Sequence, residues 1–154
     1  MAEVFFYHLT SSPLEQTLPM LLGKARGAGW RVCVRGNTRE RLAWLDEKLW
    51  LAEGFLPHGC VGTRFDADQP ILLTDIREMP NEPQCLISID GAEIEGNEVK
   101  NLERAMILFD GNDGEAVDQA RKQWTTLTGD GCAAKYWAQD GGRWIMKSEN
   151  PAAS

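Results

Sequence analysis

Short apolar runs and longer amphipathic stretches alternate along most of the chain. Runs rich in β-forming residues predict strands, whereas apolar residues three and four positions apart predict helices. Strands are predicted at residues 4–9, 30–35, 71–74, 84–89 and 104–109. Helices are predicted at about residues 13–26, 38–51 and 114–127. The connecting stretches, such as the acidic residues 90–101, are predicted to be loops.

The starts of the helices are predicted from capping residues. Ser12 precedes Pro13, and Glu15 follows three residues after Ser12, which is the spacing of a capping box. Pro19 should kink this first helix or move its start to about residue 17. Asn37 is predicted to cap the second helix.

The order of these elements predicts an α/β fold. A strand that is followed by a helix and then by a parallel strand forms a right-handed crossover. Repeated crossovers of this kind predict a mostly parallel, twisted sheet with helices on both faces. Residues 133–138 and 143–147, separated by a glycine-rich turn, predict an antiparallel hairpin at the C-terminus. We expect a single domain over residues 1–148 and a loose tail over residues 149–154.

The composition argues against several classes of protein. The longest apolar runs are too short to cross a membrane, and the N-terminus lacks the basic and apolar segments of a secretory signal. We therefore expect a cytoplasmic protein without membrane contact. The four cysteines are scattered and form no C-x-x-C pair, so free thiols are expected rather than a disulfide framework or a zinc site.

The charge is negative overall but basic in one segment. The net charge of −7 argues against a direct nucleic-acid binder with a strong basic surface. The basic cluster consists of Lys24, Arg26, Arg31, Arg35, Arg39 and Arg41. This cluster is either a solvated face or a docking patch for an acidic partner. Direct binding of single-stranded nucleic acid through Lys24–Arg41 is therefore one alternative function.

Catalytic chemistry has little support in the sequence. The turn after the first strand, HLTSSPLE, lacks the glycines of a dinucleotide site, and no P-loop is found. No nucleophile with a base and an orienting group can be assembled, and no cofactor or metal is expected. His8 ends the first strand, where α/β proteins often bind ligands. A small-ligand α/β enzyme with a pocket near His8, Thr10 and Ser11 is therefore a second alternative.

Large apolar side chains gather where a surface loop is expected. Trp50 lies near the end of the second predicted helix, and Phe55 and Pro57 follow a glycine in the next segment. Exposed aromatic groups are typical of protein-binding surfaces. Trp124 is in line with the apolar face of the third helix, which favours a core position. Arg121 lies one turn before it, and an Arg beside an aromatic also suits a peptide carboxylate with an apolar side chain.

Taken together, these segments resemble the chi subunit of the bacterial DNA polymerase III holoenzyme, a clamp-loader accessory protein. The resemblance covers nearly the whole chain. In chain order, the similar pieces are EVFFYHL, GAGWRVCVRGNTRERLAWLDEKLW, FLPH, CLISI and the A-R-x-x-W of the last helix. The L-D-x-x-L-W segment followed by F-x-P-H is the most specific of them.

The resemblance implies a non-enzymatic role in DNA replication. Chi proteins link the clamp loader, through the psi subunit, to the acidic C-terminal tail of the single-stranded-DNA-binding protein, so contact with nucleic acid is expected to be indirect. By this resemblance, Trp50, Phe55 and Pro57 fall in the region that faces psi. Arg121 and Trp124 match an Arg and an aromatic residue that line the tail pocket, which reverses the preference for Trp124 as a core residue.

Two positions depart from the family pattern. Val117 stands where a Lys would be aligned, and Asp110 stands where an apolar residue would be. The predicted hairpin is also longer than the family pattern leads us to expect. Either the contact with the tail is then weaker than in the family, or other cations contribute to the tail site, namely Lys122, Lys135, Arg143 or Lys147.

Overall fold

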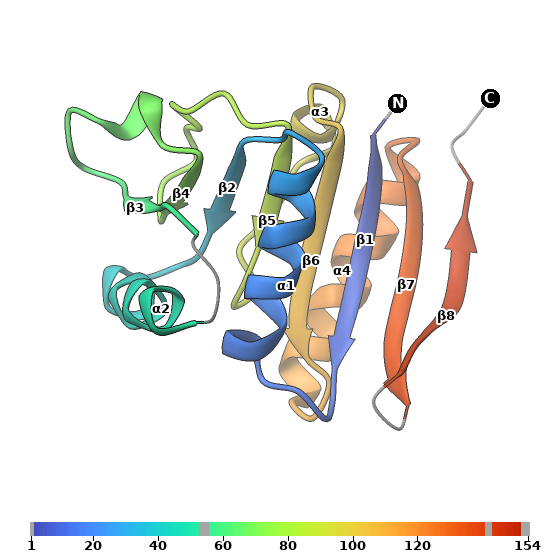
Figure 1. Ribbon diagram of the computed structural model, residues 1–154. Helices are drawn as coiled ribbons and strands as arrows, with labels where there is room; N and C mark the ends of the chain where they lie inside the picture. The colour runs from blue at the N-terminus through green and yellow to red at the C-terminus, as the bar shows by residue number, and fades with distance from the viewer. Residues whose placement is uncertain (1, 53–55, 141–142, 152–154) are drawn as a thin grey trace.

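A single sheet organises the chain (Figure 1). The computed structural model describes residues 2–52, 56–140 and 143–151. In this part of the chain the strands are β1 (Glu3–Leu9), β2 (Val32–Arg35), β3 (Gly59–Cys60), β4 (Ile71–Thr74), β5 (Cys85–Ser88), β6 (Arg104–Asp110), β7 (Ala133–Asp140) and β8 (Arg143–Asn150). Their order across the sheet is β3-β4-β2-β5-β6-β1-β7-β8. All neighbours pair in parallel except β7 and β8, which are antiparallel. The predicted mostly parallel sheet with a C-terminal hairpin is confirmed.

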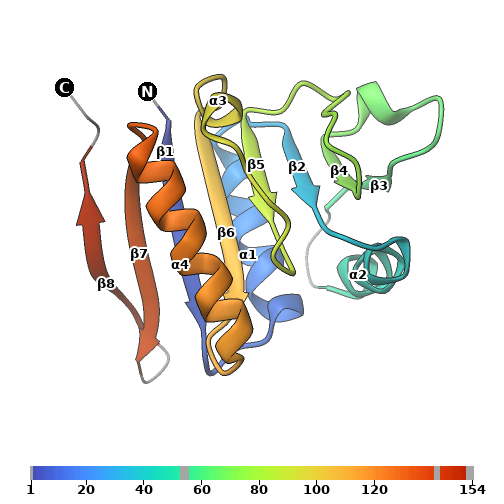
Figure 2. The same cartoon turned by 180° about the vertical axis from the view of Figure 1, so that it is seen from behind.

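Helices cover both faces of the sheet, as predicted. They are α1 (Leu14–Gly27), α2 (Arg39–Leu51), the short α3 (Gly96–Val99) and α4 (Gly114–Gly129), and a 3₁₀ turn spans Asp66–Asp68. Figure 1 shows α1 and α2 on one face, and Figure 2 shows α4 on the other. The central strand β2 is buried along its whole length, as expected for a parallel sheet covered on both sides.

Alternation along the strands divides the apolar side chains into two cores. On β1, Phe5 and Tyr7 pack towards the α1–α2 face, whereas Val4 and Phe6 pack towards the α4 face. This follows from the two-residue period of a strand. The side chain of a β1 residue can therefore be assigned to a face from its position alone, and His8 lies on the same face as Phe6.

The helix starts differ from the sequence prediction. Pro13, not Ser12, is the N-cap of α1, and no side chain caps this helix. The predicted capping box at Ser12 is therefore wrong. The side chain of Thr38, not Asn37, accepts the capping hydrogen bond of α2, from the backbone N–H of Arg41 at 3.2 Å. Pro19 lies inside α1, so the helix starts before the proline.

The side chain of Gln139 ties the C-terminal hairpin to the turn between β1 and α1. Its amide oxygen accepts hydrogen bonds from three consecutive backbone N–H groups, at 2.9 Å from Thr10, 3.0 Å from Ser11 and 3.1 Å from Ser12. Backbone N–H groups that converge in this way normally form a site for an anion. Here an internal side chain of β7 occupies that site.

The predicted basic cluster does not form one surface. Arg35 is buried, with 5% of its side chain exposed, and makes a two-point ion pair with Glu98 at 2.7 and 3.0 Å. Arg39 pairs with Asp75 at 3.0 Å, and Arg41 pairs with Asp90 at 2.9 Å. Arg35 is on β2, whereas Arg39 and Arg41 are on α2, so their side chains point in different directions. The basic run in the sequence therefore forms several separate ion pairs.

Candidate functional site

The two residues matched to the tail pocket lie one turn apart on α4. The side chain of Arg121 is 74% exposed, and the nearest carboxylate oxygen in its ion pair, from Asp118, is 4.0 Å away. Trp124 is half-buried, and its ring centroid lies 5.3 Å from that of Phe6 in the sheet. Trp124 therefore belongs partly to the core and keeps part of its ring accessible. A cation beside a partly exposed aromatic ring can hold a carboxylate and an apolar group together.

Two polar residues of the sheet lie below this pair. The hydroxyl of Tyr136 on β7 is 2.6 Å from Nδ1 of His8 on β1. The Tyr136 ring also meets Trp124 edge-on at 6.2 Å. Burial raises the pKa of Tyr136, and the nearby positive charge of Arg121 opposes this rise. Sequence reasoning assigned no role to Tyr136, although the alternation of strand positions could have placed it and His8 on the α4 face.

His8 fits at this position because residue 111 has no side chain. A Cβ at Gly111 would lie 2.0 Å from Cδ2 of His8 and 2.9 Å from the carbonyl oxygen of Leu9. We expect Gly111→Ala to lower the free energy of unfolding by about 1–3 kcal/mol, the usual cost of overpacking. Chemical denaturation followed by tryptophan fluorescence measures this change.

Gly114→Ala is the matched control, because nothing lies within 4 Å of a Cβ at Gly114. Gly114 is the first residue of α4, and alanine at this position should leave the stability unchanged or slightly increased. Equal stability of the two alanine variants would show that His8 moves away without cost.

The residues matched to the psi-facing region lie near the C-terminal end of α2. Trp50 is 54% exposed, and its ring lies tilted by 32° against that of His58 with 4.2 Å between centroids. The buried His58 is fixed by the side chain of Asp46, 3.0 Å from its Nε2 atom, and by the carbonyl oxygen of Leu56. Pro57 is half-buried and adjoins His58. Phe55 lies outside the described residues.

Other cations considered for the tail site are arranged differently. Lys122 is exposed on α4, next to Arg121. Nζ of Lys135 pairs with Glu3 at 3.3 Å and lies over the ring of Phe5, which packs on the α1–α2 face. Lys135 is therefore on the opposite side of the sheet from Trp124. Val117 is half-buried against the α4-side core.

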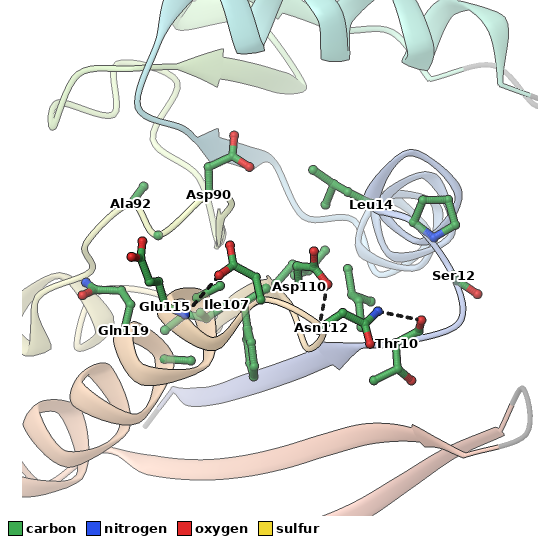
Figure 3. A pocket seen from close by; sticks show the side chains of 18 of the residues that line it. Thr10, Ser12, Leu14, Asp90, Ala92, Ile107, Asp110, Asn112, Glu115 and Gln119 are labelled. Atoms are coloured by element: carbon green, nitrogen blue, oxygen red, sulfur yellow. Dashed lines mark hydrogen bonds between the residues drawn. The ribbon is translucent and has the colours of Figure 1, made fainter.

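A cleft of about 1120 Å³ lies at the carboxyl ends of the strands (Figure 3). The chain leaves the adjacent strands β1 and β6 towards opposite faces here, which is where open α/β sheets usually bind ligands. Five carboxylate residues line it, namely Glu15, Asp90, Asp110, Asp113 and Glu115. Arg41 is the one basic residue among the described lining residues, and it pairs with Asp90. This negative lining disfavours phosphate groups.

The cleft bears on the enzyme alternative. Thr10 and Ser11 line it, as that alternative expects, but His8 does not, because its ring points to Tyr136. The N–H groups after β1 are occupied by Gln139. Within the described ranges, no three His, Cys, Asp or Glu side chains are grouped so that they could hold a metal ion. The cleft thus lacks the histidine near which this alternative places its site.

The chain is similar to a known protein family. A family model described as DNA polymerase III chi subunit, HolC, matches residues 1–135 of the chain. No curated protein matches the chain. The match includes β1 to β6, α4 and the start of β7, and it ends before Tyr136. In the described parts of the chain, none of the helices combines the length and apolar character needed to span a membrane.

Proposed function

The chain belongs to the DNA polymerase III chi subunit family, and on that premise we propose that it is a non-catalytic adaptor with two protein-binding surfaces. The tail site, defined by Arg121 and Trp124, binds the acidic C-terminal tail of the single-stranded-DNA-binding protein. The psi site, defined by Trp50, Phe55 and Pro57, binds a psi-like subunit of the clamp loader. The protein then holds the polymerase complex on template coated with single-stranded-DNA-binding protein, and its contact with DNA is indirect.

The observation that carries the tail site is the pairing of an exposed cation with a half-buried aromatic ring. The guanidinium of Arg121 is open to solvent, and its ion pair with the equally exposed Asp118 is long, at 4.0 Å. A terminal carboxylate can form two parallel hydrogen bonds with such a guanidinium. The ring of Trp124, one helical turn away, supplies apolar surface for the last side chain of the partner.

The observation that supports the psi site is the exposure of Trp50. Trp50 is 54% exposed, and Leu51 beside it is 74% exposed. Neighbouring large apolar side chains of this kind are typical of interfaces. The contact with the His58 ring restrains the indole, which reduces the side-chain entropy that is lost on binding.

The tail site is tested by titrating the protein with an acidic peptide that ends in Phe. We expect micromolar binding at low salt and a loss of about tenfold or more in Arg121→Ala, the effect of removing one charge-assisted hydrogen-bonding group. Isothermal titration calorimetry or fluorescence anisotropy measures both constants. Lys122→Ala, which removes the neighbouring exposed cation, is the matched control and should cost less.

A protein that does not bind this peptide even at low salt would count against the adaptor function. The direct nucleic-acid alternative is tested in the same experiment with a single-stranded oligonucleotide. Tight binding with a steep salt dependence would favour that alternative. The dispersal of the basic cluster into ion pairs of Arg35, Arg39 and Arg41 favours the adaptor.

A further inference from the structure

We propose that Tyr136 and His8 complete the carboxylate-binding part of the tail site. The Tyr136 hydroxyl donates a second hydrogen bond to the terminal carboxylate held by Arg121, and His8 positions that hydroxyl. This inference rests on the proposed tail site and adds to it two residues from the sheet. Tyr136 follows directly after residue 135, where the family match ends, so the family comparison does not assign it.

The strand register brings both residues to the α4 face. Phe6 pairs with Tyr136, and His8 pairs with Ala138 in the parallel ladder between β1 and β7. Residues opposite each other in a ladder point to the same side of the sheet. The Tyr136 ring stacks on Phe6 with 6.3 Å between centroids, and its hydroxyl reaches diagonally along the ladder to His8.

Trp124 connects Tyr136 to the tail-site cation, Arg121. Trp124 packs edge-on against the Tyr136 ring, and Arg121 is one turn away from Trp124 on the same helix. The nearby positive charge of Arg121 lowers the pKa of Tyr136, against the larger rise caused by burial. We therefore place a negatively charged group bound at Arg121 near the Tyr136 oxygen, on the other side of Trp124's contact with that ring.

The hydrogen bond between His8 and Tyr136 determines what the hydroxyl can offer. A phenol oxygen accepts hydrogen bonds and donates one. When Nδ1 of His8 carries its proton, it donates to the Tyr136 oxygen at 2.6 Å, and the hydroxyl proton is free to point outward. A carboxylate at Arg121 can then accept from the guanidinium and from the hydroxyl. Uncharged groups at the same position gain much less from this second donor.

The position of the His8 ring is itself restricted. The ring packs against Phe109 at 5.1 Å between centroids and occupies the space beside Gly111 that any side chain would fill. It therefore has little freedom to turn away from Tyr136. This is why we assign His8 a positioning role, with no contact to the bound peptide.

The test compares two peptides of one acidic sequence ending in Phe, one with a free carboxylate and one with a C-terminal amide. We expect the protein to prefer the carboxylate form by about tenfold. Tyr136→Phe, which removes only the hydroxyl, should reduce this preference about threefold to tenfold and leave the affinity for the amide unchanged, as expected for one hydrogen bond to a charged group. Tyr7→Phe is the matched control, because Tyr7 packs on the other face of the sheet.

His8 variants test the positioning role. His8→Asn places an amide nitrogen near the position of Nδ1 and should keep the preference for the carboxylate peptide, whereas His8→Leu should reduce it as Tyr136→Phe does. Near-UV circular dichroism confirms that each variant is folded. A positioning role predicts this difference between Asn and Leu, and a purely apolar packing role does not.

The outcomes separate this inference from the function on which it rests. If the unmodified protein binds both peptides equally, the proposed tail site fails. If the unmodified protein prefers the carboxylate and Tyr136→Phe keeps the full preference, the tail site stands and the role of Tyr136 is refuted. Equal behaviour of His8→Asn and His8→Leu would refute the positioning role of His8.

Discussion

Glu98→Ala is expected to lower the free energy of unfolding by about 3–5 kcal/mol, the usual cost of leaving a buried charge without its partner. The side chains of Arg35 and Glu98 are 5% and 12% exposed, and they form two hydrogen bonds with each other. Arg35 also donates to the carbonyl oxygens of Glu93 and Arg77. The ion pair between Arg35 and Glu98 therefore connects β2 with the segment around α3. Urea denaturation at neutral pH measures the loss.

The same pair makes stability depend on acid. Burial raises the pKa of Glu98, but the hydrogen bonds and positive charge of Arg35 outweigh this effect, so its pKa lies below the ordinary value of 4.5. A carboxyl with a lowered folded-state pKa contributes stability above the unfolded-state pKa and loses this contribution as the pH falls through the folded-state pKa. The unmodified protein should thus lose more stability below about pH 4.5 than Glu98→Ala does.

Two controls accompany this prediction. Glu95→Ala removes a neighbouring carboxylate whose ion pair with Arg77 is about half exposed and whose side chain caps α3, and these losses together should cost about 1–2 kcal/mol, less than Glu98→Ala. Replacing both Arg35 and Glu98 with apolar residues of similar size should recover much of the loss, because no unpaired charge remains. A Glu98→Ala variant as stable as Glu95→Ala would contradict the prediction.

Trp50→Ala is expected to weaken binding to a psi-like subunit by about 2 kcal/mol or more, or at least about thirtyfold, as for a central interface Trp. Trp50 is 54% exposed and contacts the ring of His58, so its removal should change the stability of the free protein by no more than about 1 kcal/mol. Co-purification and surface plasmon resonance with the second subunit measure the effect.

The control for Trp50→Ala is Phe65→Ala. Phe65 is 51% exposed and belongs to a different segment, so its loss should leave binding of the second subunit intact. Binding of the acidic peptide at Arg121 should also survive Trp50→Ala. If both binding activities disappear together, the variant is unfolded and a Trp50→Phe variant takes its place. Unchanged binding of the second subunit by a folded Trp50→Ala would rule out the psi site at this position.

Most strands and long helices could be predicted because local patterns determine them. The prediction of residues 71–74 as a strand matches β4, and the third predicted helix differs from α4 only at its end. α3 was missed because it is four residues long and its capping box begins with Glu95, within a segment that reads as an acidic loop. β8 extends to Asn150, two residues beyond the domain boundary expected at residue 148.

The roles of single polar residues could not be predicted because they depend on partners far away in sequence. Arg35 reads as part of a basic surface run, but its strand position points inward and Glu98 lies 63 residues away. Tyr136 and His8 are 128 residues apart, and only the pairing of β1 with β7 brings them together. The sequence could indicate Arg121 and Trp124 as a pair because they lie on one helix.

Gln139 supplies from within the chain the acceptor for N–H groups that in other α/β proteins can bind an anion. Its amide oxygen is tethered to the three donors after β1, so they are satisfied at every solution composition. A site filled by a diffusible anion stabilises a protein by mass action, in proportion to the logarithm of the anion concentration. Because this oxygen is part of the chain, the corner between β1 and α1 should keep its shape whatever the local supply of phosphate or nucleotide.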